Sequence, residues 1–232
     1  MKDTSLIPFI GIGSLGAMAI NNLPPDIAAK TFTVFLSRTG VIQTVTADFR
    51  IEYSYDWRTK KISGNFEECL QLLLRWNSNR IFLVVNLGGN SASICAEEIV
   101  AILYQLGKKI IIHVSTPFYF QSRSNMERTE KSLSKLRRYT PNISIGDNGA
   151  ILRECTSGIK FIDYMNYRAL IIYSAFRNNF LNHINFFITM DMKMIMKCNM
   201  TFLLMIICMI KNGYQKQCLK KNINMKMIFT SL

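Results

Sequence analysis

Two glycine-rich turns, each between a β-like run and a helix-like run, constrain the fold of this chain most strongly. The first follows the apolar run 7–12, and the second follows the run 81–86. Glycine tolerates positive φ and lets backbone N–H groups approach a phosphate, and a helix start beyond such a turn favours a bound anion. The pattern therefore predicts strands with anion-binding turns at their carboxyl ends.

The same alternation of strand and helix continues through residues 5–172. β-like runs are expected at 7–12, 32–36, 81–86 and 109–114. Helices are expected at 17–23, 69–76, 96–106 and 125–139, the last of them basic and amphipathic. Such alternation is typical of parallel strands joined by helical crossovers. We therefore predict an α/β fold with three layers and a doubly wound, mostly parallel sheet.

The texture of the sequence changes near residue 176. From Arg177 onward, one acidic residue, Asp191, stands against eight lysines and arginines, and nine of the thirteen methionines lie in this part. The apolar run Thr201–Ile210 is shorter than the roughly 20 residues that a membrane-spanning helix needs. We expect a nucleotide-binding domain at 1–175 and a helical, Met/Lys-rich tail at 176–232. The tail is either a helix packed on the sheet, an interfacial helix or a degenerate remnant.

The net charge of +13 has two interpretations. A basic chain is typical of proteins with anionic partners, such as nucleic acid or a membrane surface. The other interpretation is a compositional bias toward Lys, Asn, Ile and Met, which we favour, and we expect no nucleic-acid partner. Contact of the basic tail with an anionic membrane remains a minor alternative, since Lys211, Lys216, Lys220 and Lys221 follow the apolar run.

Cysteine usage and the N-terminus bear on the compartment. The six cysteines occur singly, without a C-x-x-C pair, and the two histidines lie apart from any cysteine cluster. We therefore expect no zinc site and a reduced setting. Residues 1–8 lack the apolar core of a signal peptide. A cytoplasmic location follows as an expectation.

The first turn, read alone, permits a reductase. Gly11, Gly13 and Gly16 have the spacing of the dinucleotide-binding fingerprint G-x-G-x-x-G. In an NAD enzyme, an acidic residue follows at the end of the next strand. Here the segment 37–39 stands in that place, and its Arg38 would suit the 2′-phosphate of NADP. An NADP-dependent reductase is therefore one alternative.

The second turn and the segments after it resemble the FtsZ/tubulin GTPase family. Residues Phe82–Gly107 align without a gap with the FtsZ segment that contains the tubulin signature G-G-G-T-G-T-G. Val114–Phe120 is similar to the family's V-T-K-P-F-x-F, and Ile143–Leu152 to its I-P-N-D-x-L-L turn. Gly158–Asp163 resembles G-I-x-x-L-D at the start of the central helix, and Phe9–Ala17 fits V-I-G-V-G-G-G-G-G-N-A.

This resemblance covers roughly residues 5–172 and is weakest between 39 and 79. It outweighs the reductase interpretation, because a reductase would not be expected to carry a second glycine loop followed by Thr-Pro-Phe-x-Phe. It implies a divergent, C-terminally truncated FtsZ-like protein of cell division, with the tail in place of the family's C-terminal domain. The implied ligand is GTP or GDP, and the implied partner is an FtsZ-type filament or a second copy of the chain.

The resemblance also implies which residues meet the nucleotide. Those of the first turn are Gly11, Gly13, Ser14, Leu15, Gly16, Ala17 and Met18. Those of the second turn are Gly88, Gly89, Asn90, Ser91 and Ala92. The positions near the sugar and the base are Gln121, Asn125, Asn148 and Ala169.

Several turn residues differ from the family pattern. Leu15 adds bulk where glycine is usual, and Met18 replaces an asparagine. Asn90 can adopt the left-handed conformation, and Ser91 keeps a hydroxyl for a phosphate oxygen. Ile94 replaces the last glycine, where a β-branched residue would be strained at positive φ.

The positions near the sugar and the base are also altered. Gln121 replaces a glutamate, and Asn125 replaces an arginine. Met165 replaces the phenylalanine that stacks on guanine, and Ala169 and Leu170 replace the Asn-Asp pair that reads the base edge. The loss of these polar partners predicts weakened GTP binding.

No catalytic residue is assigned. In this family a loop with the pattern N-x-D-x-x-D supplies carboxylates to the neighbouring subunit. Residues 182–188 match it poorly and lack both carboxylates, although His183 within them could be imagined as a replacement base. We therefore expect negligible hydrolysis. The alternative function is a non-catalytic interaction protein that caps or co-assembles with a true FtsZ.

Overall fold

The computed structural model describes residues 6–40, 44–64, 66, 78–149 and 161–181 of the 232-residue chain. These belong to one compact unit, which comprises residues 1–182. The helix expected at 69–76, the loop at 182–188 and the tail beyond it lie outside the described residues. Within the described part, no helix is long and apolar enough to cross a membrane.

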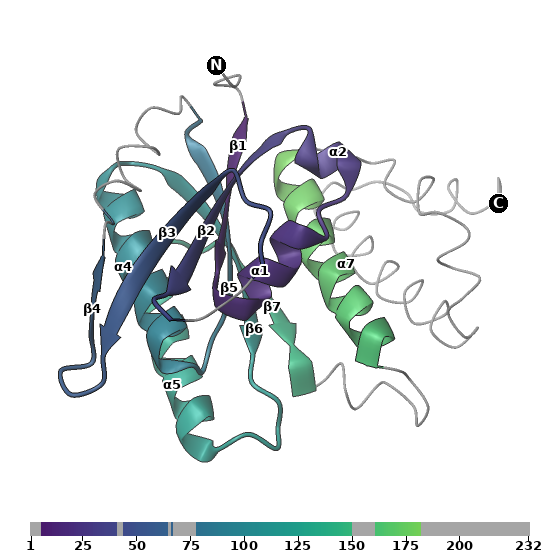
Figure 1. The fold of residues 1–232 in the computed structure, drawn as a ribbon. Helices are drawn as coiled ribbons and strands as arrows, with labels where there is room; N and C mark the ends of the chain where they lie inside the picture. Colours follow the sequence, from purple (N-terminus) through teal and green to yellow (C-terminus); the bar gives the residue numbers. More distant parts are fainter. Residues whose placement is uncertain (1–5, 41–43, 65, 67–77, 150–160, 182–232) are drawn as a thin grey trace, which may run out of the picture. The chain divides into compact units, whose positions relative to one another are not determined.

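The described elements alternate between strand and helix along most of the chain (Figure 1). The strands are β1 (Ile7–Ile12), β2 (Thr31–Arg38), β3 (Phe49–Asp56), β4 (Lys61–Gly64), β5 (Arg80–Asn86), β6 (Lys109–Thr116) and β7 (Ile143–Asp147). The helices are α1 (Gly13–Asn21), α2 (Pro25–Ala28), α4 (Asn90–Gln105), α5 (Arg123–Leu136) and α7 (Phe161–Phe180).

The strands form one seven-stranded sheet in the order β4-β3-β2-β1-β5-β6-β7. All neighbouring pairs are parallel except β3 and β4, which are antiparallel. From β1 the chain adds β2 and β3 on one side and then returns to add β5, β6 and β7 on the other. The prediction of a doubly wound, mostly parallel α/β sheet is confirmed. The direction of strand addition reverses between β1 and β5.

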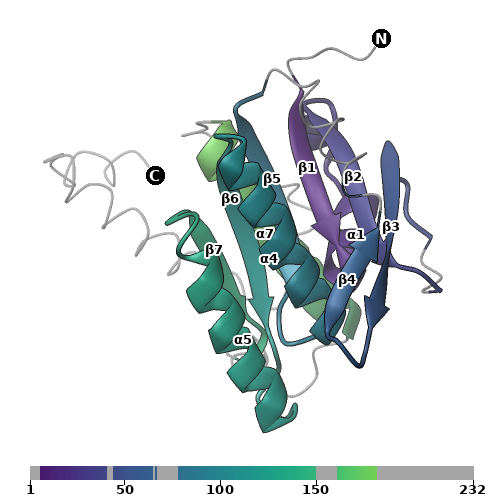
Figure 2. The ribbon, with the colours of Figure 1, turned by 90° about the vertical axis from the view of Figure 1, so that its left-hand side faces the viewer.

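Alternating apolar residues of the strands explain the three layers. Ile81, Leu83 and Val85 of β5 belong to one buried cluster, while Phe82 and Val84 belong to the other. Helices α4 and α5 cover the first cluster, and α1 and α7 cover the second, so each face of the sheet is closed by helices (Figure 2). Strands buried on both faces read as continuous apolar runs.

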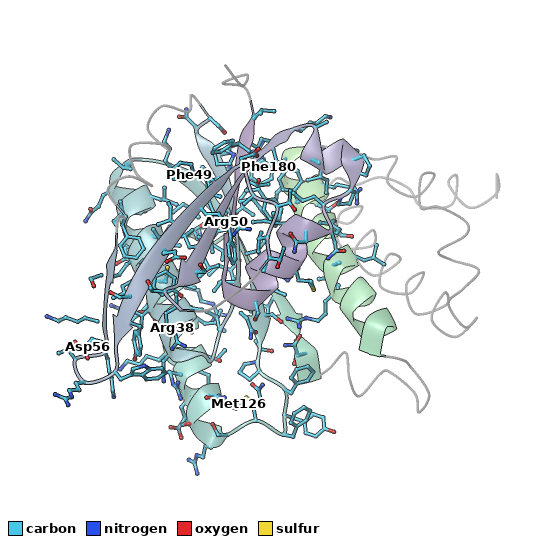
Figure 3. The ribbon with its side chains drawn as sticks, in the orientation of Figure 1. Arg38, Phe49, Arg50, Asp56, Met126 and Phe180 are labelled. Atoms are coloured by element: carbon cyan, nitrogen blue, oxygen red, sulfur yellow. The ribbon has the colours of Figure 1, made fainter. Side chains whose placement is uncertain are left out.

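Helix α7 is fixed at its carboxyl half. Phe176 packs edge-on against Phe82, with ring centroids 5.2 Å apart, and stacks on Phe180 at 4.8 Å. The Tyr173 hydroxyl donates a hydrogen bond to the backbone oxygen of Ala19 in α1 at 2.9 Å. Figure 3 shows Phe180 at the edge of the sheet opposite to Arg38 and Met126, which lie where the parallel strands end. The amino half of α7 therefore lies toward the carboxyl edge.

Several parts of the fold differ from the sequence prediction. Strands β3, β4 and β7 were not predicted, and β3 and β4 fall where the family resemblance is weakest. Helix α1 begins at Gly13 rather than at residue 17. The side chains of β3 alternate, with Ile51 and Tyr53 buried and Glu52 and Ser54 exposed, as in a strand with one solvated face. Helix α4 begins at Asn90 rather than at residue 96. The shape of the second glycine turn explains this earlier start.

Candidate nucleotide-binding site

The two glycine turns meet at the point where the strand order reverses. Strand β1 leads directly into α1, and β5 leads through residues 87–89 into α4. A Cβ atom placed on Gly13 would lie 3.6 Å from the Cβ of Ala92, so the two turns lie side by side with room for little more than a methyl group at this point. Open α/β sheets bind their ligands at this edge, beyond the carboxyl ends of the strands. The turns therefore form the candidate site.

The first turn is held by contact between two backbones. A Cβ on Gly16 would lie 2.5 Å from the Cα of Gly11, and a Cβ on Gly11 would lie 2.8 Å from the Cα of Gly16. Neither position has room for a side chain, so this pair packs α1 directly on β1. Gly13 between them has a φ of 65° and begins the helix.

The other residues of the first turn divide between surface and core. Ser14 is exposed, Met18 is partly buried, and Ala17 is buried. Leu15 is 3% exposed and lines a narrow gap, too small for a water molecule, with Asn148 and Arg168 among its other walls. The bulk of the Leu15 side chain is thus directed into the interior. It lies beside Asn148, one of the positions predicted near the sugar and the base.

Gly88 sets the shape of the second turn. Its φ is 94°, and a Cβ there would lie 2.6 Å from the Cγ of Pro117. Its N–H donates a hydrogen bond to the Ser93 hydroxyl at 3.2 Å, so this donor is satisfied within the chain. Gly89 is exposed and caps the start of α4, and a Cβ placed on it would meet no atom of the described residues within 4 Å.

Neither Asn90 nor Ile94 has a positive φ, so Asn90 does not use the left-handed conformation open to it, and Ile94 is not strained in place of the family's glycine. Asn90 is the first residue of α4, and Ile94 lies within its second turn. Among the described non-glycine residues, positive φ occurs at Lys60 alone. Only Gly88 needs that conformation in the second turn, so the helix begins as soon as Gly89 has turned the chain.

Arg128 of α5 holds two of the predicted site residues together. Its guanidinium donates hydrogen bonds to Oδ1 of Asn90, to Oδ1 of Asn125 at 3.1 Å and to Oγ of Ser124 at 3.3 Å. Within the described part of the chain it forms no ion pair. Sequence analysis missed Arg128, although it lies three residues after Asn125 and therefore on the same face of a helix.

Ser91 faces a tyrosine. The Tyr53 hydroxyl is hydrogen-bonded to the Ser91 side chain, and burial raises the pKa of Tyr53 to about 12. Tyr53 is 1% exposed, so its hydroxyl needs a partner from the protein. The Ser91 hydroxyl, which the family resemblance places near a phosphate oxygen, therefore interacts with β3.

Polar side chains on and beneath α7 form one hydrogen-bonded group and one separate pair. Oγ of Ser115 donates to Oδ1 of Asn148 at 2.8 Å and accepts from Arg168 at 3.0 Å. Nδ1 of His113 lies 3.3 Å from Oγ of Ser144. Burial, reinforced by the positive charge of Arg168, lowers the pKa of His113 to about 4, so its ring is neutral near pH 7. These polar groups are therefore hydrogen-bonded within the protein.

The remaining predicted positions carry few polar contacts. Ala169 is buried in the cluster between α1, α7 and the sheet, and Leu170 beside it is partly buried. Gln121 is exposed in the loop between β6 and α5, where its backbone N–H donates to the oxygen of Phe118 at 3.0 Å. The side chain of Met165 lies outside the described part. The structure thus brings both turns and Asn125 together, and it places Asn148 beneath α7 and Ala169 on α7 itself.

Comparisons with known proteins agree with this arrangement. No protein-family profile matches the chain. It is 22% identical over 178 residues to the cell division protein FtsZ of Buchnera aphidicola subsp. Baizongia pistaciae, which covers 72% of this chain and 46% of that protein. The chain therefore spans less than half the length of this relative.

Solved structures show the same fold. The empty FtsZ dimer of M. jannaschii matches with a TM-score of 0.60 at 16% identity, over 76% of this chain and 55% of that one. CetZ2 of Haloferax volcanii, in a GTPγS-bound protofilament, matches with a TM-score of 0.59 at 17% identity, over 76% and 57%. By its sequence and its fold, the chain is a distant member of the FtsZ/tubulin family.

Proposed function

We propose that this chain binds a guanine nucleotide weakly at the junction of the two glycine turns and hydrolyses GTP negligibly. The observation that carries the proposal is the close approach of the two turns, at Gly13 and Ala92, at the point where strand order reverses. A member of the FtsZ/tubulin family with this geometry has the backbone framework for phosphate binding. The proposed setting is cell division in the cytoplasm, with an FtsZ-type filament or a second copy as partner.

Weak nucleotide binding is inferred because polar groups at the candidate site already interact with other groups of the protein. The N–H of Gly88 is bonded to Ser93, the Ser91 hydroxyl to Tyr53, and Oδ1 of Asn148 to Ser115. A ligand would have to displace these bonds or do without them, and each charge-assisted bond that is missing costs about 1.5–3 kcal/mol.

Negligible hydrolysis is inferred from the sequence of residues 182–188, which lacks the family's paired carboxylates. Carboxylates in that loop would position the attacking water in the neighbouring subunit. GTP turnover that increases with protein concentration would contradict the proposal, because it would indicate a site completed between subunits.

The test is to identify any nucleotide that co-purifies and then to titrate the full chain with GTP, GDP, ATP and NADPH by calorimetry. We expect GTP and GDP to bind more tightly than ATP or NADPH. Tighter binding of NADPH would instead favour a reductase, for which Arg38 is the candidate 2′-phosphate contact. The guanidinium carbon of Arg38 lies 5.4 Å from the centre of the Trp57 ring.

A second candidate function is a non-catalytic protein that caps or co-assembles with a true FtsZ. The observation that favours it is that side chains within the protein hold the second turn. Arg128 is hydrogen-bonded to Asn90, and Tyr53 to Ser91. Light scattering of a true FtsZ with GTP, with and without this chain, tests it. A changed filament mass combined with no nucleotide binding by the chain would favour this function.

A further inference from the structure

Asn86 ends β5 immediately before the second turn and carries a buried acceptor without a donor. Among the described residues, two buried side-chain polar atoms lack a hydrogen-bond partner, namely Oδ1 of Asn86 and Nε of Arg80. Buried polar atoms in proteins nearly always have a partner, so an exception calls for a physical reason.

Arg80 has such a reason. Its guanidinium carbon lies 4.6 Å from the centre of the Phe180 ring, so the ring face interacts with the cation. Arg80 also begins β5 and therefore lies at the edge opposite to the glycine turns. Asn86 has no comparable contact with the described residues, and it lies at the edge where the family fold places its ligands.

The side-chain alternation of β5 places Asn86 on the face covered by α1 and α7. Phe82 and Val84 face the cluster on that side, and Asn86 continues their series. On the neighbouring strand, Ser115 is its partner in register, and Ser115 is hydrogen-bonded to Asn148 and Arg168. Two polar residues thus lie side by side, one satisfied within the protein and one not.

We propose that Oδ1 of Asn86 accepts a hydrogen bond from the nucleoside part of the bound nucleotide. This inference rests on the proposed function and names a contact that the family pattern did not indicate. The donor is a sugar hydroxyl or a base N–H, because phosphate oxygens act as acceptors. Phosphates at the two glycine turns would then leave the nucleoside beside the end of β5.

The proposal predicts opposite effects on stability and on binding. Asn86→Ala removes an unsatisfied acceptor, so the melting temperature of the nucleotide-free chain should stay the same or rise by about 2–4 °C. The same change removes the contact with the nucleotide, so the affinity for GDP should fall about tenfold. A residue with a purely structural role would lose stability instead.

Ser115→Ala is the matched control, since Ser115 pairs with Asn86 in register but is satisfied within the protein. It should lower the melting temperature of the nucleotide-free chain, because Asn148 and Arg168 each lose a partner. A lower melting temperature for Asn86→Ala, similar to that of Ser115→Ala, would overturn the inference.

Nucleotide analogues identify the donor without relying on a variant. Four analogues each remove one donor of the nucleoside: 2′-deoxy-GDP, 3′-deoxy-GDP, inosine diphosphate, which lacks the 2-amino group, and N1-methyl-GDP. The intact chain should bind one of them about tenfold more weakly than GDP, according to which donor is used. Asn86→Ala should bind that analogue as tightly as it binds GDP, because the contact is already missing. If all four analogues bind the intact chain as GDP does, or if Asn86→Ala binds GDP normally, this inference fails while the proposed function stands. An intact chain that binds no nucleotide refutes both.

Discussion

The two glycine turns lie against each other at one edge of the sheet, but different forces hold them. The first turn is a contact between the backbones of Gly11 and Gly16, with no space for a side chain. In the second turn, Asn90 is held by Arg128 and Ser91 by Tyr53. A backbone contact tolerates no added atom, whereas a turn held by side chains accepts other residues that bring their own partners. This difference accounts for polar residues in the second turn where the family pattern has glycine and threonine.

The largest effect on stability is expected from a substitution that disrupts the first turn. Gly16→Ala places a Cβ 2.3 Å from the carbonyl carbon of Gly11, so α1 has to move away from β1. Overpacking of this kind costs about 3 kcal/mol. The free energy of unfolding, measured by urea denaturation, should fall by that amount.

Gly89→Ala in the second turn is the matched control. No atom of the described residues lies within 4 Å of the position of its Cβ, and its φ of −74° suits any residue. The free energy of unfolding should stay within about 0.5 kcal/mol of the unchanged chain. If the two alanine variants were equally stable, the contrast between the turns would be refuted.

A smaller effect is expected from removing the cation that supports the second turn. Arg128→Ala leaves Asn90 and Asn125 without their donor and should cost about 1.5 kcal/mol of stability. It should also weaken GDP binding, because Asn90 begins α4 at the candidate site. The measurements are urea denaturation and calorimetric titration.

Arg123→Ala on the same helix provides the comparison. The Arg123 side chain is 92% exposed and pairs with Glu127 at 2.9 Å on the surface. Such a pair contributes about 0.3–0.5 kcal/mol, and the pair does not touch the second turn. Equal losses of stability for the two arginine variants would show that Arg128 has no special role.

The smallest effect concerns Tyr53 and depends on pH. Tyr53→Phe removes the hydrogen bond to Ser91 and should cost about 1 kcal/mol near pH 8. The folded-state pKa of Tyr53, about 12, lies above the unfolded value of about 10. Ionisation therefore favours the unfolded chain, and the unchanged protein should lose stability as pH rises from about 10 to about 12.

The variant lacks this loss, so the two stability curves should converge and cross between about pH 10 and 11. Denaturant midpoints measured across this range provide the test, and the absorbance of tyrosinate reports the ionisation. Parallel curves would mean that Tyr53 is accessible to solvent in the folded protein.

The sequence was sufficient to predict the mostly parallel sheet and its strands β1, β2, β5 and β6, but not its outer strands or the details of the site. Each apolar run, such as Ile7–Ile12, predicts a strand because a strand buried on both faces needs apolar side chains throughout. The turn-to-helix boundary was misplaced at α4. Its position depends on Gly88 passing beside Pro117, which is a contact between residues distant in the sequence.

The hydrogen bonds of the second turn could not be predicted for the same reason. Arg128 and Asn90 are 38 residues apart, and no periodic pattern connects them. Tyr53 lies on a strand that sequence analysis missed, although the alternation of Ile51, Glu52, Tyr53 and Ser54 is a usable signal. Asn86 was assigned to a strand end, but its lack of a partner among the described residues is visible only in three dimensions.

The outermost described strands also bear on how this chain could assemble. Strand β4 has four residues and carries the exposed Lys61, and β7 has five residues and ends at the exposed Asp147. Short edge strands that carry charge are poor templates for the addition of a foreign strand and so limit aggregation. The sheet edges are thus unsuited to polymerisation, and ordered stacking of copies would require surfaces formed by the helices and loops.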